Sequence, residues 1–369
     1  MLITFASFGT PNGLLTKLIC KPSVSEEKKR KGDRNMKTRK TCITAMMLSF
    51  LIGIVFFSVD SGAATKFLTI GSTSTSSSHY SYFVAVAKII NDNVPGVNAT
   101  VVATGASVDN LKRMSKGQVD LGLVTLDAGY MAYHGLGSWK ESPFKKQRVM
   151  WLYLTTAVHY VVREDSGVKT LYDLNKKKFH PGMRGSASET SAMAILKILG
   201  VEPEYHRGDT ADAVAAVKDN RIAGISKSGL GKGFDASIMD IATFTPVRVL
   251  EFTDKEIKKV NAEMPYTSWI TVPAGTIKGM GEFRTVAMVN FVIGVEDIPE
   301  EIGYRVVKAI CGDMDTQVAA FPGMKGLNIP KATLEAVTSV SNPLPLHPGT
   351  VKYFNELGLK VPKDLIPPK

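Results

Sequence analysis

Apolar and polar residues alternate with two different periods along most of the chain after Lys66. Short β-prone runs such as FLTIG, VNATVV and DLGLV are each followed by a stretch whose apolar residues recur three and four positions apart. The pattern predicts helices at 80–91, 107–116, 187–199, 211–219, 254–263, 302–314 and 351–357. Alternating strands and helices predict an α/β fold whose sheets are parallel and doubly wound, with helices on both faces.

Two such α/β units follow one another along the chain. The second begins after Arg163, and the chain then passes through the extended segments SWITVPAGT and TVAMVNFVIGV. We therefore expect one lobe from 65–162 together with 268–369, and a second lobe from 163–267. Ligands bind where the carboxyl ends of strands meet in such sheets, so the expected site is a cleft between the lobes.

The first 64 residues have the pattern of a leader and not of a folded domain. The basic segment MKTRK at 36–40 precedes the uncharged apolar run at 43–57, and small residues follow at 61–64. This order is typical of a secretory signal peptide at 36–64. An uncleaved membrane anchor is the alternative, although the uncharged run only just reaches the length of a bilayer span. Residues 1–35 predict no element, so we expect translation to begin at Met36.

Removal of this leader changes the charge and the cysteine count. Residues 1–64 carry 10 Lys and Arg and 4 Asp and Glu, so the formal net charge falls from +11 to +5 and Cys311 becomes the only cysteine. The remaining lysines are interspersed with acidic residues, which indicates no nucleic-acid-binding surface. One cysteine predicts no internal disulfide. The modest positive balance mildly favours anionic ligands.

Sequence motifs for a metal, a cofactor or catalysis are missing. No HExxH, CxxC or acidic calcium loop occurs, and the six histidines lack metal-ligand spacing. No GxSxG nucleophile elbow occurs, and GLGKG at 229–233 has the wrong spacing for a GxGxxG nucleotide loop. The sequence therefore predicts a protein that binds a small ligand without a cofactor and without reacting with it.

Four strand-to-helix corners carry small and hydroxyl-bearing residues. They are GSTSTSSSHY at 71–80, TGAS at 104–107, TLD at 125–127 and GMRGSASET at 182–190. A helix N-terminus presents free backbone N–H groups and a positive dipole end, which together bind anions. Ser107 is expected to cap its helix. The candidate ligand residues at these corners are Ser74, Thr75, His79, Tyr80, Gly105, Ser107, Asn110, Thr125, Asp127, Arg184, Gly185, Ser186 and Thr190.

Several candidates also fit a role in the fold alone. The corner at 104–107 fits an ordinary tight βα connection, and the serine-rich corner at 71–80 fits a flexible loop. Arg184 fits either a bidentate pair with a ligand carboxylate or a solvated position. Tyr153, in WLYLTTAVHYVV, completes the candidate set and fits either a ligand contact or core packing.

Six stretches of the chain carry a family resemblance. They are ATGASVDNL, QVDLGLVTLDAGYMA, VVREDSGVKTLYDL, PGMRGSASET, the VPAGTI–TVAMVNFVIG passage and PLPLHPGTVKYFNELGL, in order between about residues 67 and 359. Together they resemble the TAXI-type (TRAP-associated extracytoplasmic immunogenic) solute-binding receptors of TRAP transporters. The resemblance implies a two-lobed, type II-like periplasmic binding fold. It also implies a small organic anion or amino acid as ligand, glutamate-like or a dicarboxylate, which the receptor delivers to a TRAP membrane subunit.

The resemblance also places the family's ligand loops on this chain. Its first glycine-rich loop falls on 71–80, its TGGSxxN turn on 104–110, and its GSxxT corner on 185–190. Here the first loop is rich in serine and threonine, and Ala106 replaces the second glycine of TGGS. SKSGLGKGFD stands where many members have a short segment of small residues and proline, so Lys227 is expected to reach the cleft. These departures concern the ligand's identity and not the fold.

The leading hypothesis is a periplasmic receptor that binds a small anion for transport. One alternative is a receptor that serves a sensor or another class of transporter, which neighbouring genes would distinguish. The other is a periplasmic hydrolase or transferase. That alternative requires a nucleophile and base in the cleft, formed by His79 or His159 with Ser107 or Ser186.

We predict that the exported chain begins near Thr65, because the small residues at 61–64 follow the apolar core of the leader. N-terminal sequencing of protein taken from the periplasm checks this start. A chain retained in the membrane with residues 43–57 intact would contradict it.

Overall fold

The computed structural model describes residues 65–367. The predicted leader at 36–64 and the predicted start at Met36 lie outside the described residues. The described residues belong to one compact unit. Within 65–367, no helix has both the length and the apolar character needed to cross a bilayer.

Strands and helices alternate through most of this unit, as the sequence pattern predicts. The strands are β1 (Lys66–Gly71), β2 (Val97–Val102), β3 (Leu121–Thr125), β4 (Gln147–Arg163), β5 (Lys178–His180), β6 (Glu204–Tyr205), β7 (Gly224–Ser228), β8 (Val247–Leu250), β9 (Ser268–Val272) and β10 (Phe283–Val295). The helices are α2 (Ser78–Asn93), α3 (Ser107–Ser115), α4 (Leu126–His134), α5 (Ala187–Leu199), α6 (Thr210–Lys218), α7 (Ala236–Phe244), α8 (Asp254–Glu263), α9 (Glu300–Gly312), α10 (Met314–Ala320), α11 (Ile329–Val337) and α12 (Pro348–Glu356).

The strands form a ten-stranded sheet of mixed direction. Its order is β2-β1-β3-β10-β4-β7-β5-β6, and β8 and β9 pair with β4 and β10. β1 is parallel to β2 and β3, and β5 is parallel to β6 and β7. β10 runs antiparallel to β3 and β4, and β4 runs antiparallel to β7. The expectation of wholly parallel sheets is therefore wrong for the strands that join the lobes, because a continuous apolar run reads alike in either direction.

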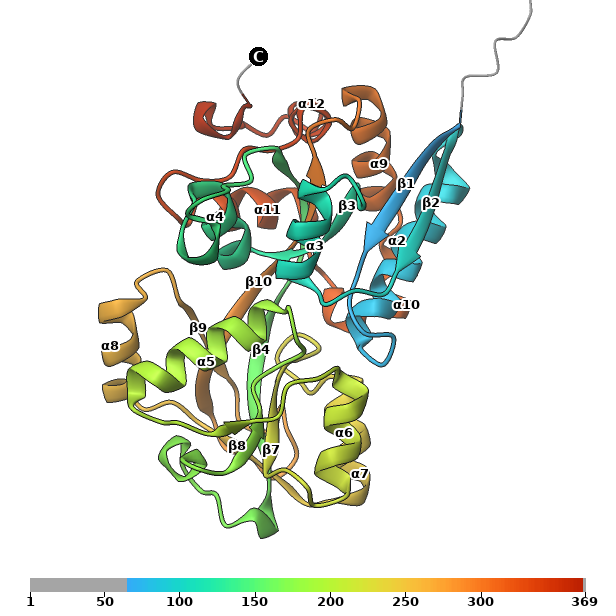
Figure 1. The fold of residues 1–369 in the computed structure, drawn as a ribbon. Coiled ribbons are helices and arrows are strands. Elements are labelled where there is room, and N and C mark those ends of the chain that lie inside the picture. The colour runs from blue at the N-terminus through green and yellow to red at the C-terminus, as the bar shows by residue number, and fades with distance from the viewer. Residues whose placement is uncertain (1–64, 368–369) are drawn as a thin grey trace, which may run out of the picture. The chain divides into compact units, whose positions relative to one another are not determined.

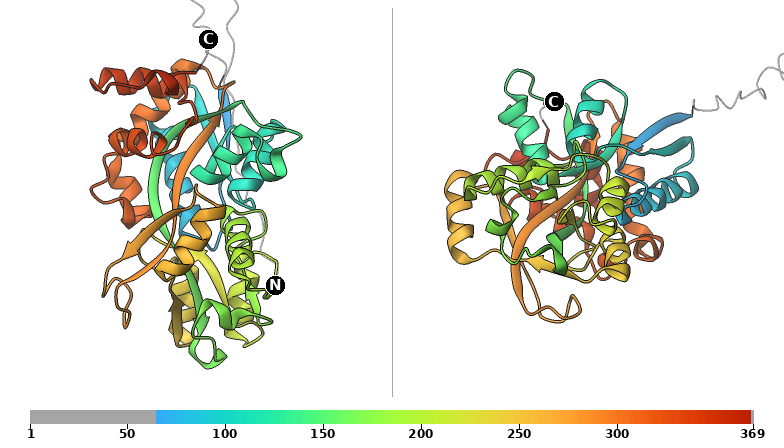
Figure 2. Two further views of the ribbon diagram at one scale, coloured as in Figure 1. Left: turned by 90° about the vertical axis from the view of Figure 1, so that its left-hand side faces the viewer. Right: turned by 60° about the horizontal axis from the view of Figure 1, so that its bottom comes forward.

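β4 and β10 extend through both lobes (Figures 1 and 2). The C-terminal half of β10 pairs with β3, and its N-terminal half pairs with β9. β4 pairs with β10 along 147–157 and with β7 and β8 from 158 onward. One lobe thus contains β1–β3 and the other β5–β8, and two continuous strands connect them. β9 begins at the predicted boundary 267/268 and pairs with the N-terminal half of β10, which lies in the second lobe. The bounds of the two lobes stay a prediction.

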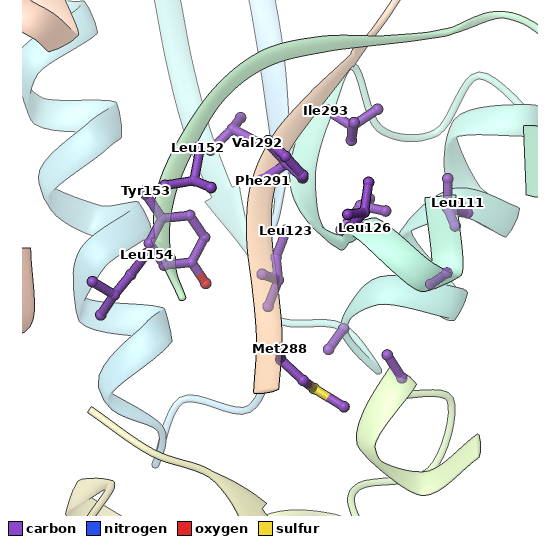
Figure 3. Packing of buried hydrophobic residues seen from close by; sticks show 14 of the residues in the cluster. Leu111, Leu123, Leu126, Leu152, Tyr153, Leu154, Met288, Phe291, Val292 and Ile293 are labelled. Atoms are coloured by element: carbon purple, nitrogen blue, oxygen red, sulfur yellow. The ribbon is translucent and has the colours of Figure 1, made fainter. Parts of the chain in front are cut away.

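The long strand β4 lies in the interior of the sheet, and both of its faces are covered. Of its 17 residues only Thr155 is not buried, which explains the near-continuous apolar run WLYLTTAVHYVV. Tyr153 stacks on Tyr82 of α2 with ring centroids 4.4 Å apart, and the indole N–H of Trp151 donates to the Tyr82 hydroxyl at 2.9 Å. Figure 3 shows Tyr153 beside Leu152 and Leu154 on this strand. These contacts hold α2 against β4.

His347 lies outside the cleft, and its burial determines its hydrogen bonds and its pKa. Its Nδ1 accepts the backbone N–H of Gly349 at 3.1 Å, and its Nε2 lies 2.9 Å from the carbonyl oxygen of Ile298. The neutral ring with its proton on Nε2 therefore satisfies both partners. Burial lowers the pKa of His347 to about 4. Burial also lowers the pKa values of His159 and His180 to about 4.

We expect the free energy of unfolding to fall as the pH drops from about 6.5 toward 4. In this window the unfolded chain binds protons that the folded histidines do not, which removes up to about 3 kcal/mol for each such histidine. His347→Asn keeps a side-chain acceptor for the cap of α12 but does not titrate. Denaturant unfolding at several pH values should show a smaller pH dependence for this variant. An unchanged pH dependence would contradict the assignment.

Candidate ligand-binding site

A small inner cavity of about 40 Å³ lies where the two lobes meet. Five helices begin at it, and each contributes at least one residue from its cap or first turn, among them His79 (α2), Ser107 (α3), Thr125 (α4), Ala187 (α5) and Thr210 (α6). Each helix N-terminus carries partial positive charge and backbone N–H groups without helical partners. Lys227 adds a full charge, and among the described residues it is the only formally charged side chain that lines this cavity. The inner cavity is therefore electropositive.

Lys227 is held by a buried contact between the lobes. Its Nζ donates to Ser77 Oγ at 3.0 Å and lies 3.8 Å from Asp235 Oδ1. Asp235 is fully buried, caps α7 through Ser237, and accepts the backbone N–H of Ser78 at 3.1 Å. Burial alone would raise the pKa of Asp235, but the charge of Lys227 and the bonds from Ser237 lower it. This contact joins the second lobe to the first turn of α2.

His79 presents a free ring nitrogen to the inner cavity. Its Nδ1 lies 2.8 Å from the hydroxyl oxygen of Tyr153. Its buried Nε2 has no hydrogen-bond partner in the described part of the chain. Burial and the charge of Lys227 lower the pKa of His79 to about 3, so the ring is neutral near pH 7. A buried polar atom without a partner costs stability, which a ligand or water in the cavity would recover.

Two hydroxyl groups at the same cavity are also left without a well-aligned partner. Thr125 lies near the Asp127 carboxyl and Ser226 lies near Tyr160, but neither hydroxyl makes a hydrogen bond of good geometry. Both can rotate toward a ligand without breaking a bond of the fold. Hydroxyls of this kind accept or donate, so they adapt to an anion and to water alike.

The start of α3 differs from the sequence expectation. Ala106 is the N-cap, with φ 67° and no side-chain capping bond, and Ser107 is the first helical residue. The prediction of Ser107 as the cap is therefore wrong. Its Oγ instead accepts the backbone N–H of Thr125 at 3.2 Å, which ties α3 to the end of β3. The Ser107 side chain still lines the cavity.

The glycines at 105 and 185 serve the contact between the lobes. The Gly185 carbonyl accepts the backbone N–H groups of Val108 and Asp109, both at 3.1 Å, so the second lobe occupies two donors of α3. A Cβ on Gly105 would lie 2.7 Å from the carbonyl oxygen of Arg184. Close approach of two backbones therefore explains Gly105, and a φ of 86°, in the left-handed region, explains Gly185.

The predicted ligand residues divide into groups by their surroundings. His79, Ser107, Thr125 and Ser186 line the inner cavity, as does Lys227. Ser74, Asn110 and Tyr153 are buried, and their side chains bond to other groups of the fold. Thr75, Arg184 and Thr190 are exposed, and Tyr80 is half-buried. Asp127 lines a second, outer cavity of about 450 Å³.

The cavity also has polar lining residues that the sequence reasoning did not name: Thr73, Ser188, Thr210, Ser226, Ser228 and Asn290. Ser226 and Ser228 flank Lys227 on the buried strand β7, and Asn290 interrupts the apolar run of β10. Polar residues within buried strands are the signal that could have found Ser226, Ser228 and Asn290, because each such residue needs a partner.

Residues 70–358 match the model of the NMT1-like family. The chain belongs to the NMT1-like family. This confirms the resemblance to the TAXI receptors, and NMT1-like proteins are solute-binding proteins and not enzymes. Among residues 65–367, no group of three or more His, Cys, Asp or Glu side chains is placed to hold a metal ion.

Several solved binding proteins are distantly similar to this NMT1-like chain. The ligand-binding component of an ABC-type import system from Staphylococcus aureus, with zinc bound, shares 14% identity over 82% of this chain and 97% of its own, with a TM-score of 0.44. An ancestral arginine-binding protein bound to arginine shares 15% over 69% and 97%, with a TM-score of 0.42. The alkanesulfonate-binding protein SsuA from Xanthomonas axonopodis pv. citri, bound to MOPS, shares 15% over 82% and 97%, with a TM-score of 0.42. Similarity at this level carries no inference about ligand or partner.

Asn110 should contribute to stability and not to ligand affinity. Its Nδ2 lies 3.2, 3.0 and 2.9 Å from the carbonyl oxygens of Gly71, Ser72 and Leu123, and its Oδ1 accepts the Thr104 hydroxyl at 2.7 Å. Asn110→Ala would leave these buried groups without a partner and lower the free energy of unfolding by about 3 kcal/mol.

Chemical denaturation checks this, with the exposed Ser115→Ala on the same helix as the control, for which we expect a change within about 0.5 kcal/mol. An Asn110→Ala variant as stable as the parent would show that these bonds do not support the fold.

Proposed function

We propose that this protein is an extracytoplasmic receptor that encloses a small organic anion or amino acid between its lobes and delivers it to a TRAP membrane subunit. The glutamate-like and dicarboxylate ligands implied by the family resemblance belong to this class. The sequence supports export to the periplasm through the predicted leader, and the NMT1-like family supports the binding role.

The observation that carries this proposal is the convergence of five helix N-termini and Lys227 on one cavity between the lobes. Each helix end favours an anion by about 0.3–1 kcal/mol at an exposed site. Most residues that line this cavity are buried, so the solvent screens these interactions less and each becomes stronger. A carboxylate also accepts the hydrogen bonds that free N–H and hydroxyl groups donate. An anion is therefore the ligand class that this cavity favours.

Closure of the lobes also follows from contacts around the inner cavity. The Gly185 carbonyl reaches the start of α3, and Lys227 and Asp235 reach Ser77 in the first turn of α2. A ligand enters only when these contacts separate, and it becomes shielded from water when they form again. Polar contacts across the closing surface are suited to this cycle, because water can replace them in the open state.

The candidate hydrolase site finds other partners in the structure. The hydroxyls of Ser107 and Ser186 accept the backbone N–H groups of Thr125 and Glu189. His79 bonds to Tyr153, and His159 Nε2 lies 3.1 Å from the Gly233 carbonyl oxygen. These residues therefore support the fold and the cavity. A receptor that serves a sensor or another transporter class remains the alternative to TRAP delivery, and the neighbouring genes distinguish the two.

We expect Ser107→Leu to weaken binding of the native ligand at least tenfold, or about 1.4 kcal/mol, because leucine would fill part of the inner cavity. The ligand is first identified by mass spectrometry of small molecules released from the purified, denatured protein. Calorimetry then compares Ser107→Leu with Ser115→Leu, which lies at the far, exposed end of the same helix and should leave affinity unchanged. Equal affinities of the two variants would place the site elsewhere.

A further inference from the structure

The outer cavity lies next to the inner one and has a different chemistry. Its volume is about 450 Å³, and its walls come from α4, the segment 264–268, the N-terminal half of β10 and the segment 339–341. Most of the side chains in these walls are apolar or aromatic, such as Leu126, Met264 and Tyr266. Asp127 is the only formally charged side chain that lines it among the described residues. The outer cavity therefore suits an apolar group better than an anion.

Three elements pass from one cavity to the other. On α4, Thr125 lines the inner cavity and Asp127 the outer; on α5, Ser188 lines the inner and Ser191 the outer. Met288 projects from β10 (Figure 3). It lines both cavities, and its Sδ lies 3.4 Å from Ser188 Oγ. A methionine side chain is unbranched and flexible, so it adapts to a group that passes beside it.

The size of the inner cavity limits what it can hold by itself. Its 40 Å³ has room for roughly three water molecules, which is about the size of one carboxylate group. A larger ligand must extend beyond it, and the outer cavity is the adjoining space of sufficient size. Burial raises the pKa of Asp127. In its ionised form this carboxylate opposes a second carboxylate there, because two like charges repel strongly where solvent screening is weak.

We propose that the outer cavity holds the uncharged tail of a monocarboxylate whose head lies in the inner cavity, and that Asp127 rejects dicarboxylates. The inference rests on the proposed function and narrows its ligand class. The carboxylate head contacts the helix N-termini and Lys227, Met288 contacts the first carbons of the tail, and the apolar walls cover the remainder. Affinity then depends on tail length, and selectivity depends on the charge at the far end of the tail.

The test uses acetate, butanoate, hexanoate and hexanedioate as probes. The mature chain is freed of co-purified ligand by unfolding and refolding, and binding is measured at pH 8 by calorimetry. Burial of each methylene should tighten binding about fourfold, so hexanoate should bind roughly 15-fold more tightly than butanoate. Hexanedioate should bind at least tenfold more weakly than hexanoate.

Variants separate the two cavities. Ser191→Trp would fill the outer cavity from α5, and Ser341→Trp would fill it from the segment 339–341. In both variants the affinity should no longer depend on tail length, and the affinity for acetate should be unchanged. Two positions are used in case one variant fails to fold. Asp127→Asn should reduce the ratio of the hexanoate affinity to the hexanedioate affinity at least fivefold. Ser115→Trp, on the exposed end of α3, should behave as the parent.

The outcomes distinguish this inference from the proposed function. Acids that bind with the same affinity whatever their length would overturn the tail compartment but leave an anion receptor. Hexanedioate that binds as tightly as hexanoate would overturn the role of Asp127. Failure of all four probes to bind would overturn this inference, whereas the proposed receptor for a small anion or amino acid fails only if Ser107→Leu leaves the affinity for the native ligand unchanged.

Discussion

The antiparallel pairing of β4 with β10 is the interaction on which the rest of the structure depends. Both strands cross from one lobe to the other, and each changes its partners half-way. At the crossing, Asn290 Nδ2 lies 3.0 Å from both the Leu154 carbonyl oxygen and Thr156 Oγ1, and Thr156 Oγ1 lies 2.5 Å from Ser228 Oγ. Motion of the lobes must therefore bend or twist this strand pair, which confines it to a hinge beside the inner cavity.

The electrostatics of the cavity follow from this arrangement. Helices that follow strands begin at the carboxyl ends of those strands, so two lobes that face each other bring several helix N-termini together. Ser77 and Asp235 hold the Lys227 amino group in this buried place, and Asp235 is itself bonded at the start of α7. Asp235 therefore stabilises Lys227 without itself lining the inner cavity, and among the described residues the lining of that cavity carries no negative side chain.

The bounds of a helix were predictable from the sequence where residues close by in the chain determine them. Helices α5 and α8 have the predicted bounds, because Gly200 ends the first in a left-handed conformation and Thr253 begins the second with a capping box. The strand β2 was also predicted, and a helix begins at each of the four predicted corners. The cap of α3 was not, because Ser107 turns toward Thr125 on a neighbouring element, a contact that no local pattern contains.

The sequence by itself determined the two-lobed α/β fold class, the family and the residue types at the predicted corners. These depend on spacing and side-chain chemistry along a short stretch of chain. The tertiary structure decided the antiparallel hinge strands, the use of Gly105 and Gly185 in the contact between the lobes, and the placement of Asn110 in the fold and Asp127 in the outer cavity. Each of these depends on which distant segment lies opposite a residue, and spacing along the chain carries no information about that neighbour.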